Sequence, residues 1–221
     1  MTVAEAVAGL RRQMAEAGAD PDRVRVVAVT KGQPFEAVAE AAGAGLVDLG
    51  ENYAQELLAK AARATEAGLA GLRWHFLGAV QRNKVADLAP VVWLWQSVDR
   101  AEEAGAIARS APGARVLVQV AIAPGPGRGG CAPEEAAGLV EASRRLGLDP
   151  LGLMAVGAPD DPGTTADGFR WLAAEASRLG LPEVSMGMSE DFRSAVQAGS
   201  TMVRIGRALF GPRPGAVGLR R

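Results

Sequence analysis

Residues 24–31 read VRVVAVTK, a run of apolar and mostly β-branched residues that ends in a lysine. A run of this length and composition is typical of a strand that is buried on both faces. A helical pattern follows it, and the alternation of apolar strand and helix repeats along the chain. The pattern predicts eight strands, and each of the first seven is followed by a helix. Such an alternation favours an α/β fold with a parallel sheet, and eight strands favour closure into a (β/α)8 TIM barrel over an open sheet.

The limits of each element follow from hydrophobic periodicity and from the Gly and Pro residues between elements. The predicted strands are 24–30, 46–49, 74–77, 91–95, 115–122, 151–154, 184–186 and 202–205. The predicted helices are 3–18, 33–42, 51–66, 83–88, 100–110, 133–146, 164–179 and 190–198, with a short helix opening at Gly206. We expect one domain over residues 1–221, with an N-terminal helix inside residues 1–20 and a loose tail at 212–221.

The composition argues against several classes of protein. Charged residues make up 22% of the chain and the formal net charge is -1, so no overall field attracts nucleic acid or an anionic membrane. One cysteine, Cys131, and one histidine, His75, leave no intrachain disulfide and make a transition-metal site unexpected. No apolar run has the length of a transmembrane helix, and the first residues do not resemble a signal peptide. We expect a cytoplasmic protein that binds neither nucleic acid nor a membrane.

Lys31 is the first candidate for chemistry. Active sites of TIM barrels lie at the C-terminal ends of the strands, and Lys31 directly follows the first strand. Burial or a nearby cation lowers the pKa of a lysine in the barrel mouth and yields the neutral amine that attacks an aldehyde. The alternative is a lysine whose ammonium group simply reaches solvent at the end of a strand.

Three positions near the C-terminus indicate an anion or ligand site. Ser189 precedes an acidic helix start, and Gly206 follows the eighth strand, where free N–H groups of a short helix favour a phosphate. The alternative is that Ser189 caps its helix and Gly206 only makes a turn. Arg204 lies inside the apolar run MVRI. A charge there is costly unless it contacts a ligand or forms a salt bridge across the barrel end.

Three other features have simpler explanations. The segment GPGRGG at 125–130 lacks the spacing of a Walker or Rossmann motif, so we expect a loop that presents Arg128. His75 lies within a predicted strand, where a hydrogen-bonded structural role is expected rather than a ligand role. Cys131 has no evident activating group nearby and is expected to be a structural or exposed thiol.

Six segments together resemble one family. They are VAVTK (27–31), GENYAQEL (50–57), WHFLGAVQRNKV (74–85), SVD (97–99), GLMA (152–155) and SMGMSEDFRSAVQAGSTMVRIG (185–206). From about residue 5 to residue 211 the chain is similar to the pyridoxal phosphate homeostasis proteins, also called the YggS/PROSC or PLP-binding protein family. The resemblance implies a barrel like the N-terminal domain of alanine racemase, with pyridoxal 5'-phosphate (PLP) as its cofactor.

The resemblance also implies roles for individual residues. PLP would be held as a Schiff base on Lys31, and Arg204 would face its pyridine nitrogen. A cation in that place keeps the nitrogen unprotonated and makes the ring a weaker electron sink. The phosphate would be held by the hydroxyl of Ser189 and by the backbone at Gly206 and Arg207. The residues implied to lie near the ring are Asn52 and Met154.

The chain departs from the family pattern at a few positions. Ala79 stands where histidine is frequent, Ala121 where asparagine is usual, and Gly129 within a segment that commonly reads Lys-Ser-Gly. Arg207 replaces the usual Thr or Ser. The lost polar groups are expected to weaken contacts to the cofactor, and the guanidinium of Arg207 is expected to compensate by pairing with the phosphate.

The resemblance implies a carrier and regulator of PLP rather than an enzyme, with PLP-dependent apoenzymes as partners. We expect a monomer without independent catalysis. The main alternative is a PLP-dependent amino-acid racemase, which needs a proton acceptor on one face of the substrate and a donor on the other. The only tyrosine available as a donor is Tyr53. A third hypothesis is an aldolase that forms a Schiff base on the lysine without a cofactor and binds a phosphorylated sugar.

Overall fold

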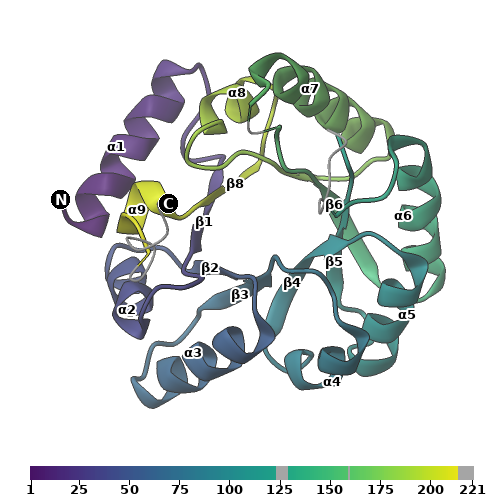
Figure 1. Cartoon of the computed structure of the whole chain (residues 1–221), viewed down its shortest axis with the longest axis horizontal. Coiled ribbons are helices and arrows are strands. Elements are labelled where there is room, and N and C mark those ends of the chain that lie inside the picture. The colour runs from purple at the N-terminus through teal and green to yellow at the C-terminus, as the bar shows by residue number, and fades with distance from the viewer. Residues whose placement is uncertain (123–128, 159, 214–221) are drawn as a thin grey trace, which may run out of the picture.

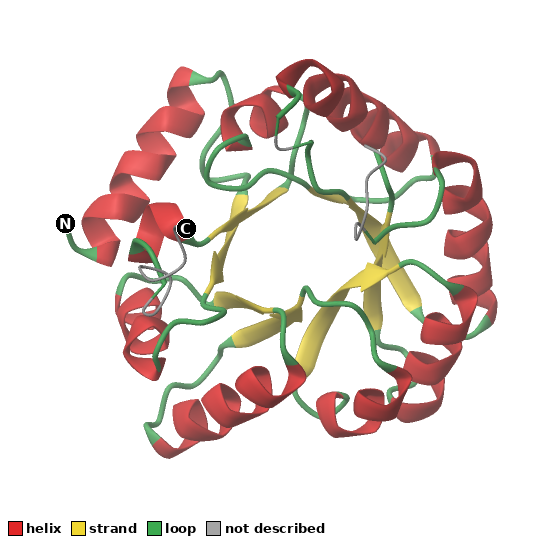
Figure 2. Ribbon diagram, viewed as in Figure 1, coloured by secondary structure: helices red, strands yellow, loops and turns green. Residues whose placement is uncertain are grey.

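A ring of helices surrounds a closed parallel barrel in the computed structural model, which describes residues 1–122, 129–158 and 160–213 (Figures 1 and 2). Each strand pairs with the next one in the chain, and the last strand pairs with the first. Because β1 lies between β2 and β8, the sheet has no free edge. The prediction of a closed (β/α)8 barrel is confirmed.

Eight strands and their helices alternate along the described chain. The strands are β1 (Arg25–Val29), β2 (Asp48–Glu51), β3 (Arg73–Phe76), β4 (Val92–Val98), β5 (Arg115–Gln119), β6 (Asp149–Met154), β7 (Glu183–Ser185) and β8 (Met202–Ile205). The α-helices are α1 (Val3–Glu16), α2 (Phe35–Gly43), α3 (Ala54–Glu66), α4 (Val85–Leu88), α5 (Ala101–Ser110), α6 (Ala136–Arg145), α7 (Pro162–Arg178), α8 (Phe192–Gln197) and α9 (Arg207–Phe210). Two short 3₁₀ helices, η1 (Arg82–Lys84) and η2 (Pro133–Glu135), lead into α4 and α6.

Apolar side chains fill the inside of the barrel. One buried cluster draws on five strands, β1, β4, β5, β6 and β8. Side chains from strands that are not neighbours in the sheet meet only across the interior, so this cluster is the inner core. Its buried members are Val27, Leu94, Leu117, Met154 and Met202. A larger apolar layer lies between the strands and the surrounding helices, where Phe76 and Trp95 pack edge to face.

The sequence prediction was wrong about one element boundary that affects the site. Residues 51–66 were predicted as one helix with Glu51 in its first turn, but Glu51 is the last residue of β2 and α3 begins at Ala54. The carboxylate of Glu51 is fully buried and accepts hydrogen bonds from Lys60 and Thr30. These two partners hold the acidic side chain inside the protein, so it does not lie at the solvent-exposed start of a helix.

The two ends of the described chain lie close together. The N-terminal helix α1 packs beside α9, which follows the last strand (Figure 1). A capping box of Thr2 and Glu5 begins α1. The predicted loop with Arg128 and most of the predicted tail fall on residues 123–128 and 214–221, which are outside the described residues. Within the described ranges, no helix combines the length and the apolar character needed to cross a membrane.

Candidate functional site

A cavity of about 610 Å³ opens at the C-terminal ends of the strands. Its lining comes mainly from residues at or just beyond the C-terminal ends of all the strands except β4, with further residues from α7 and α8. All the positions that the sequence singled out as cofactor-binding line this one cavity. They are Lys31, Asn52, Met154, Ser189, Arg204, Gly206 and Arg207.

Lys31 lies in the mouth of the barrel just beyond β1. Burial lowers the pKa of its amine, and the positive charges of Arg213 and Arg204 lower that pKa further. The carboxylate of Glu51 acts in the opposite direction without reversing the shift. Lys31 therefore carries a larger fraction of neutral amine at a given pH than a lysine in solvent, which is the form that attacks a carbonyl.

A buried ion-pair network fixes the backbone on both sides of Lys31. The amine of Lys60 donates to the carbonyl of Thr30 at 2.6 Å and to the carboxylates of Glu51 at 2.7 Å and Glu56 at 2.9 Å. The same Glu56 oxygen accepts the N–H of Gly32 at 2.6 Å. The residues before and after Lys31 are therefore both bonded to one cluster on β2 and α3. This cluster holds the segment that carries the reactive amine.

Burial and hydrogen bonding act in opposite directions on the carboxyl group of Glu51 in that cluster. Burial raises the pKa of its carboxyl, although the hydrogen bonds from Lys60 and Thr30 lower it. One carboxyl oxygen, Oε2, is buried without a hydrogen-bond partner in the described part of the chain. The stability of this carboxylate therefore depends on Lys60, which is its nearest cation.

Arg204 of β8 is buried, yet every hydrogen bond found for it goes to a neutral oxygen. Its Nη1 donates at 2.8 Å both to the carbonyl and to the hydroxyl of Ser185, and its Nη2 donates to the carbonyl of Ala155 at 2.7 Å. Among the described residues no carboxylate lies within salt-bridge distance of it, so the alternative of a salt bridge across the barrel end is wrong. Burial lowers the pKa of Arg204 to about 10, which leaves it charged at neutral pH.

The opposite side of the cavity is formed by the segments around β7 and β8. Gly206 precedes α9, and the Ser189 hydroxyl accepts the N–H of Ala208 at 3.2 Å. Ser189 does not cap α8, which begins at Phe192. The guanidinium of Arg207 donates to Glu190 at 2.7 Å on the exposed rim. The hydroxyl hydrogen of Ser189 and the backbone at the start of α9 are the groups that this side offers to an anion.

Asn52 and Met154 complete the cavity with one polar and one apolar group. Asn52 directly follows β2, and its Oδ1 is buried with no hydrogen-bond partner among the described residues. A buried carbonyl oxygen without a partner is costly, and a donor on a bound ligand removes that cost. Met154 ends β6 and presents a nearly fully buried side chain to the same cavity.

Sequence reasoning missed two cations of the site. Lys60 lies in the middle of a predicted helix, where nothing in a single sequence distinguishes it from a solvent-exposed lysine. Arg213 falls in what was predicted as a loose tail, but it lines the cavity and lies over Gly32, where an added Cβ would meet the Arg213 side chain at 3.0 Å. The prediction for the first residues of that tail was therefore wrong.

The two residues expected to have structural roles lie away from the cavity lining. His75 is fully buried and hydrogen-bonded to Asp48 at 2.8 Å. The Cys131 side chain is buried too, and burial together with the charges of Glu135 and Asp99 raises the pKa of its thiol to about 11. A thiol with such a pKa is a poor nucleophile at neutral pH.

The fold and the arrangement of the site define a class of protein. The family model for the alanine racemase N-terminal domain matches residues 8–214. The solved alanine racemase of Clostridium difficile superposes with a TM-score of 0.71 at 18% identity, covering 93% of this chain and 56% of the racemase. The chain is thus a barrel of the alanine racemase N-terminal type.

Closer relatives identify the family within that class. Pyridoxal phosphate homeostasis proteins of Pseudomonas aeruginosa and Deinococcus radiodurans are each 39% identical to this chain, covering 96% and 95% of it and 94% and 100% of the relatives. The chain belongs to the family of pyridoxal phosphate homeostasis proteins. PipY of Synechococcus elongatus, solved with PLP bound, matches at 32% identity with a TM-score of 0.83, covering 95% of this chain and all of PipY.

The network around Lys60 leads to a stability prediction. Lys60→Met leaves the buried Glu51 carboxylate without its cation, and we expect it to lower the free energy of unfolding by about 3–5 kcal/mol. The control Arg144→Met breaks an exposed pair with Glu141 and should cost less than about 1 kcal/mol. Urea denaturation measures the free energy of unfolding of both variants. The double variant Glu51→Gln/Lys60→Met should recover more than half of the loss. A Lys60→Met cost no larger than that of the control would contradict the prediction.

Proposed function

We propose that this chain binds PLP covalently through the amine of Lys31 and acts in PLP homeostasis. The observation that carries the proposal is a single cavity lined both by a lysine biased toward its neutral form and by a buried arginine whose hydrogen bonds, among the described residues, all go to neutral oxygens. PLP supplies an aldehyde that condenses with a primary amine. The names of the family relatives and the PLP-bound structure of PipY support the same ligand.

The residues present fit this cofactor. A volume of about 610 Å³ is in the range of ordinary cofactor sites. The partnerless Oδ1 of Asn52 offers a buried acceptor beside the ring, and Met154 offers an apolar surface. Arg204 faces the pyridine nitrogen in this proposal. Its charge disfavours protonation of that nitrogen, which limits the capacity of the ring to stabilise a carbanion.

The phosphate group belongs at the start of α9 in this proposal. The Ser189 hydroxyl and the backbone N–H groups of Gly206 and Arg207 are the donors. The Arg207 guanidinium already donates to Glu190. In this proposal it therefore shares its hydrogen bonds between that carboxylate and the phosphate. This side of the cavity therefore contributes hydrogen bonds more than net positive charge.

We propose further that the protein carries PLP without turning over amino acids itself. A racemase needs a proton donor on the face of the substrate opposite the lysine. The only tyrosine of the chain, Tyr53, is 62% exposed and is not among the residues that line the cavity. In this proposal the protein is a cytoplasmic monomer that supplies PLP-dependent apoenzymes.

Covalent capture of PLP at one lysine tests the proposal. The chain has three lysines, Lys31, Lys60 and Lys84. After incubation with PLP and reduction by borohydride, we expect peptide mass spectrometry to find one pyridoxyl group, at Lys31. The visible absorbance of the unreduced complex should be lost in Lys31→Ala and kept in the control Lys84→Ala. Labelling at Lys60 or Lys84 in place of Lys31, or absorbance that survives Lys31→Ala, would refute the proposal.

The charges around Lys31 predict a pH dependence. Because the positive charge of Arg213 lowers the pKa of Lys31, removing it in Arg213→Met raises that pKa. At pH 7 less of the amine is then neutral, and we expect the ligand-free protein to take up PLP about two to three times more slowly. The difference should disappear at a pH well above the pKa.

Stopped-flow absorbance between pH 6 and pH 10 measures the uptake rate. Arg170→Met on α7, whose side chain pairs with Asp167 on the surface, is the matched control. A rate difference that stays constant over the whole pH range would show that Arg213 acts by contact rather than through the Lys31 amine.

A further inference from the structure

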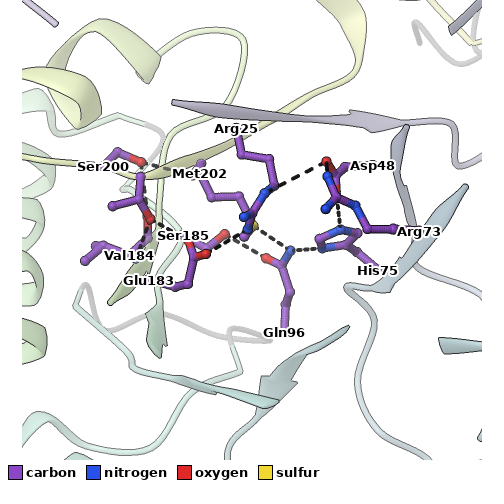
Figure 3. Close-up of polar contacts among 11 residues, drawn as sticks. Arg25, Asp48, Arg73, His75, Gln96, Glu183, Val184, Ser185, Ser200 and Met202 are labelled. Carbon is purple, nitrogen blue, oxygen red and sulfur yellow. Dashed lines mark hydrogen bonds and ion pairs between the residues drawn. The ribbon is translucent and has the colours of Figure 1, made fainter. Parts of the chain in front are cut away.

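A line of polar side chains crosses the apolar interior of the barrel. It runs from Asp48 on β2 through His75 on β3, Gln96 on β4 and Ser185 on β7 to Arg204 on β8. Figure 3 shows the first four of these residues. Each of the five has at most 5% of its surface exposed. This interior chain joins the base of the barrel, where Asp48 pairs with Arg73 at 2.5 Å, to the cavity that holds Lys31.

The positions of the hydrogen atoms in the interior chain follow from its Asp48 end. The carboxylate of Asp48 only accepts, so His75 donates to it from Nε2 at 2.8 Å. Burial lowers the pKa of His75, which keeps the ring neutral and leaves Nδ1 as an acceptor. The amide nitrogen of Gln96 therefore donates to Nδ1 at 2.7 Å, and it also contacts the sulfur of Met202 at 3.0 Å.

The same directions follow from the other end of the chain. A guanidinium only donates, so Arg204 donates a hydrogen bond to the hydroxyl oxygen of Ser185 at 2.8 Å. The hydroxyl hydrogen then goes to the carbonyl oxygen of the Gln96 side chain at 2.7 Å. The Asp48 end and the Arg204 end of the interior chain thus require the same orientation of the Gln96 side-chain amide. Reversing that amide would place its oxygen against an unprotonated His75 nitrogen and remove the acceptor of Ser185.

We propose that Gln96, with His75 and Ser185, positions Arg204 toward the pyridine nitrogen of bound PLP. This inference rests on the proposed function of the cavity. None of the three side chains lines the cavity, so they act through Arg204. Buried polar groups that are hydrogen-bonded to one another in a low-dielectric interior hold each other in one arrangement. The guanidinium is therefore fixed before PLP binds.

The competing explanation is that these side chains only hold the strands together. The charged groups facing His75 are Asp48, Arg25 and Arg73, and the ring of Trp93 packs 5.2 Å from its own. A purely structural chain would affect folding stability but not the state of a bound ligand. Ser200 offers a matched control, because its buried hydroxyl lies within hydrogen-bond distance of three backbone carbonyls on or beside β7 and β8, and none of its hydrogen bonds involves Arg204.

The first measurement is made on ligand-free protein. His75 is the only histidine of the chain, so ¹⁵N-histidine labelling gives one assignable ring. We expect the neutral tautomer protonated at Nε2, with Nδ1 shifted as a hydrogen-bond acceptor, and we expect Gln96→Met to remove that acceptor shift. A charged ring, or the tautomer protonated at Nδ1, would overturn the inference whether or not PLP binds.

The second measurement follows PLP labelled with ¹⁵N in its pyridine ring. In Gln96→Met and Ser185→Ala we expect the ring nitrogen signal to move toward the protonated range and the Kd for PLP to rise about three- to tenfold. Ser200→Ala should keep the parent signal and a Kd within about twofold of the parent. Two interior variants are used because either one alone risks poor folding, which thermal unfolding of each would report.

The outcomes separate the two proposals. A parent protein that gains no pyridoxyl group at Lys31 contradicts the proposed function. The ¹⁵N spectrum of His75 still tests the hydrogen-bond directions in the interior chain. Normal PLP capture with a ring nitrogen signal that is unchanged in both interior variants would overturn the positioning role and leave the proposed function intact.

Discussion

The burial of the Arg204 guanidinium, with no salt-bridged carboxylate among the described residues, is the constraint on which the rest of the site depends. A charged group inside a protein is costly unless it is hydrogen-bonded, and here the carbonyl and hydroxyl oxygens of Ser185 on β7 and the carbonyl oxygen of Ala155, just after β6, accept from the guanidinium. The charge of Arg204 therefore forms no salt bridge among the described residues, although the carboxylate of Asp191 partly offsets it. The field of Arg204 extends into the cavity, where it lowers the pKa of Lys31 and disfavours a second positive charge.

Closure of the sheet makes this arrangement possible. Because β8 pairs with β1, the strand that carries Arg204 lies beside the strand that leads to Lys31. The cluster around Lys60 fixes the backbone on both sides of Lys31, and the interior chain reaches Arg204 from the base of the barrel. The amine of Lys31 and the guanidinium of Arg204 are thus held by separate sets of contacts at the same end of the barrel. A site built in this way suits a ligand that carries an aldehyde, because the lowered pKa of Lys31 favours the amine form that attacks it.

The sequence predicted the barrel because its strands are continuous apolar runs separated by helical patterns. It also predicted which strand ends meet, since Lys31 and Asn52 follow such runs and Arg204 lies within the last one. It could not predict that Glu51 ends a strand, because its buried partners Thr30 and Lys60 lie on other elements and hold it there. Local pattern likewise gave no sign of Arg213 over the cavity or of the amide of Gln96 between His75 and Ser185. These contacts join distant parts of the chain, and only the closed barrel brings them together.

The most direct test of the account is a crystal structure of the protein grown with PLP. The expected result is continuous density between the side chain of Lys31 and the cofactor, with the pyridine nitrogen toward Arg204 and the phosphate at the start of α9. A cofactor bound in the reverse orientation, with its phosphate on Arg204, would contradict the account, because the buried guanidinium would then serve as an anion-binding group.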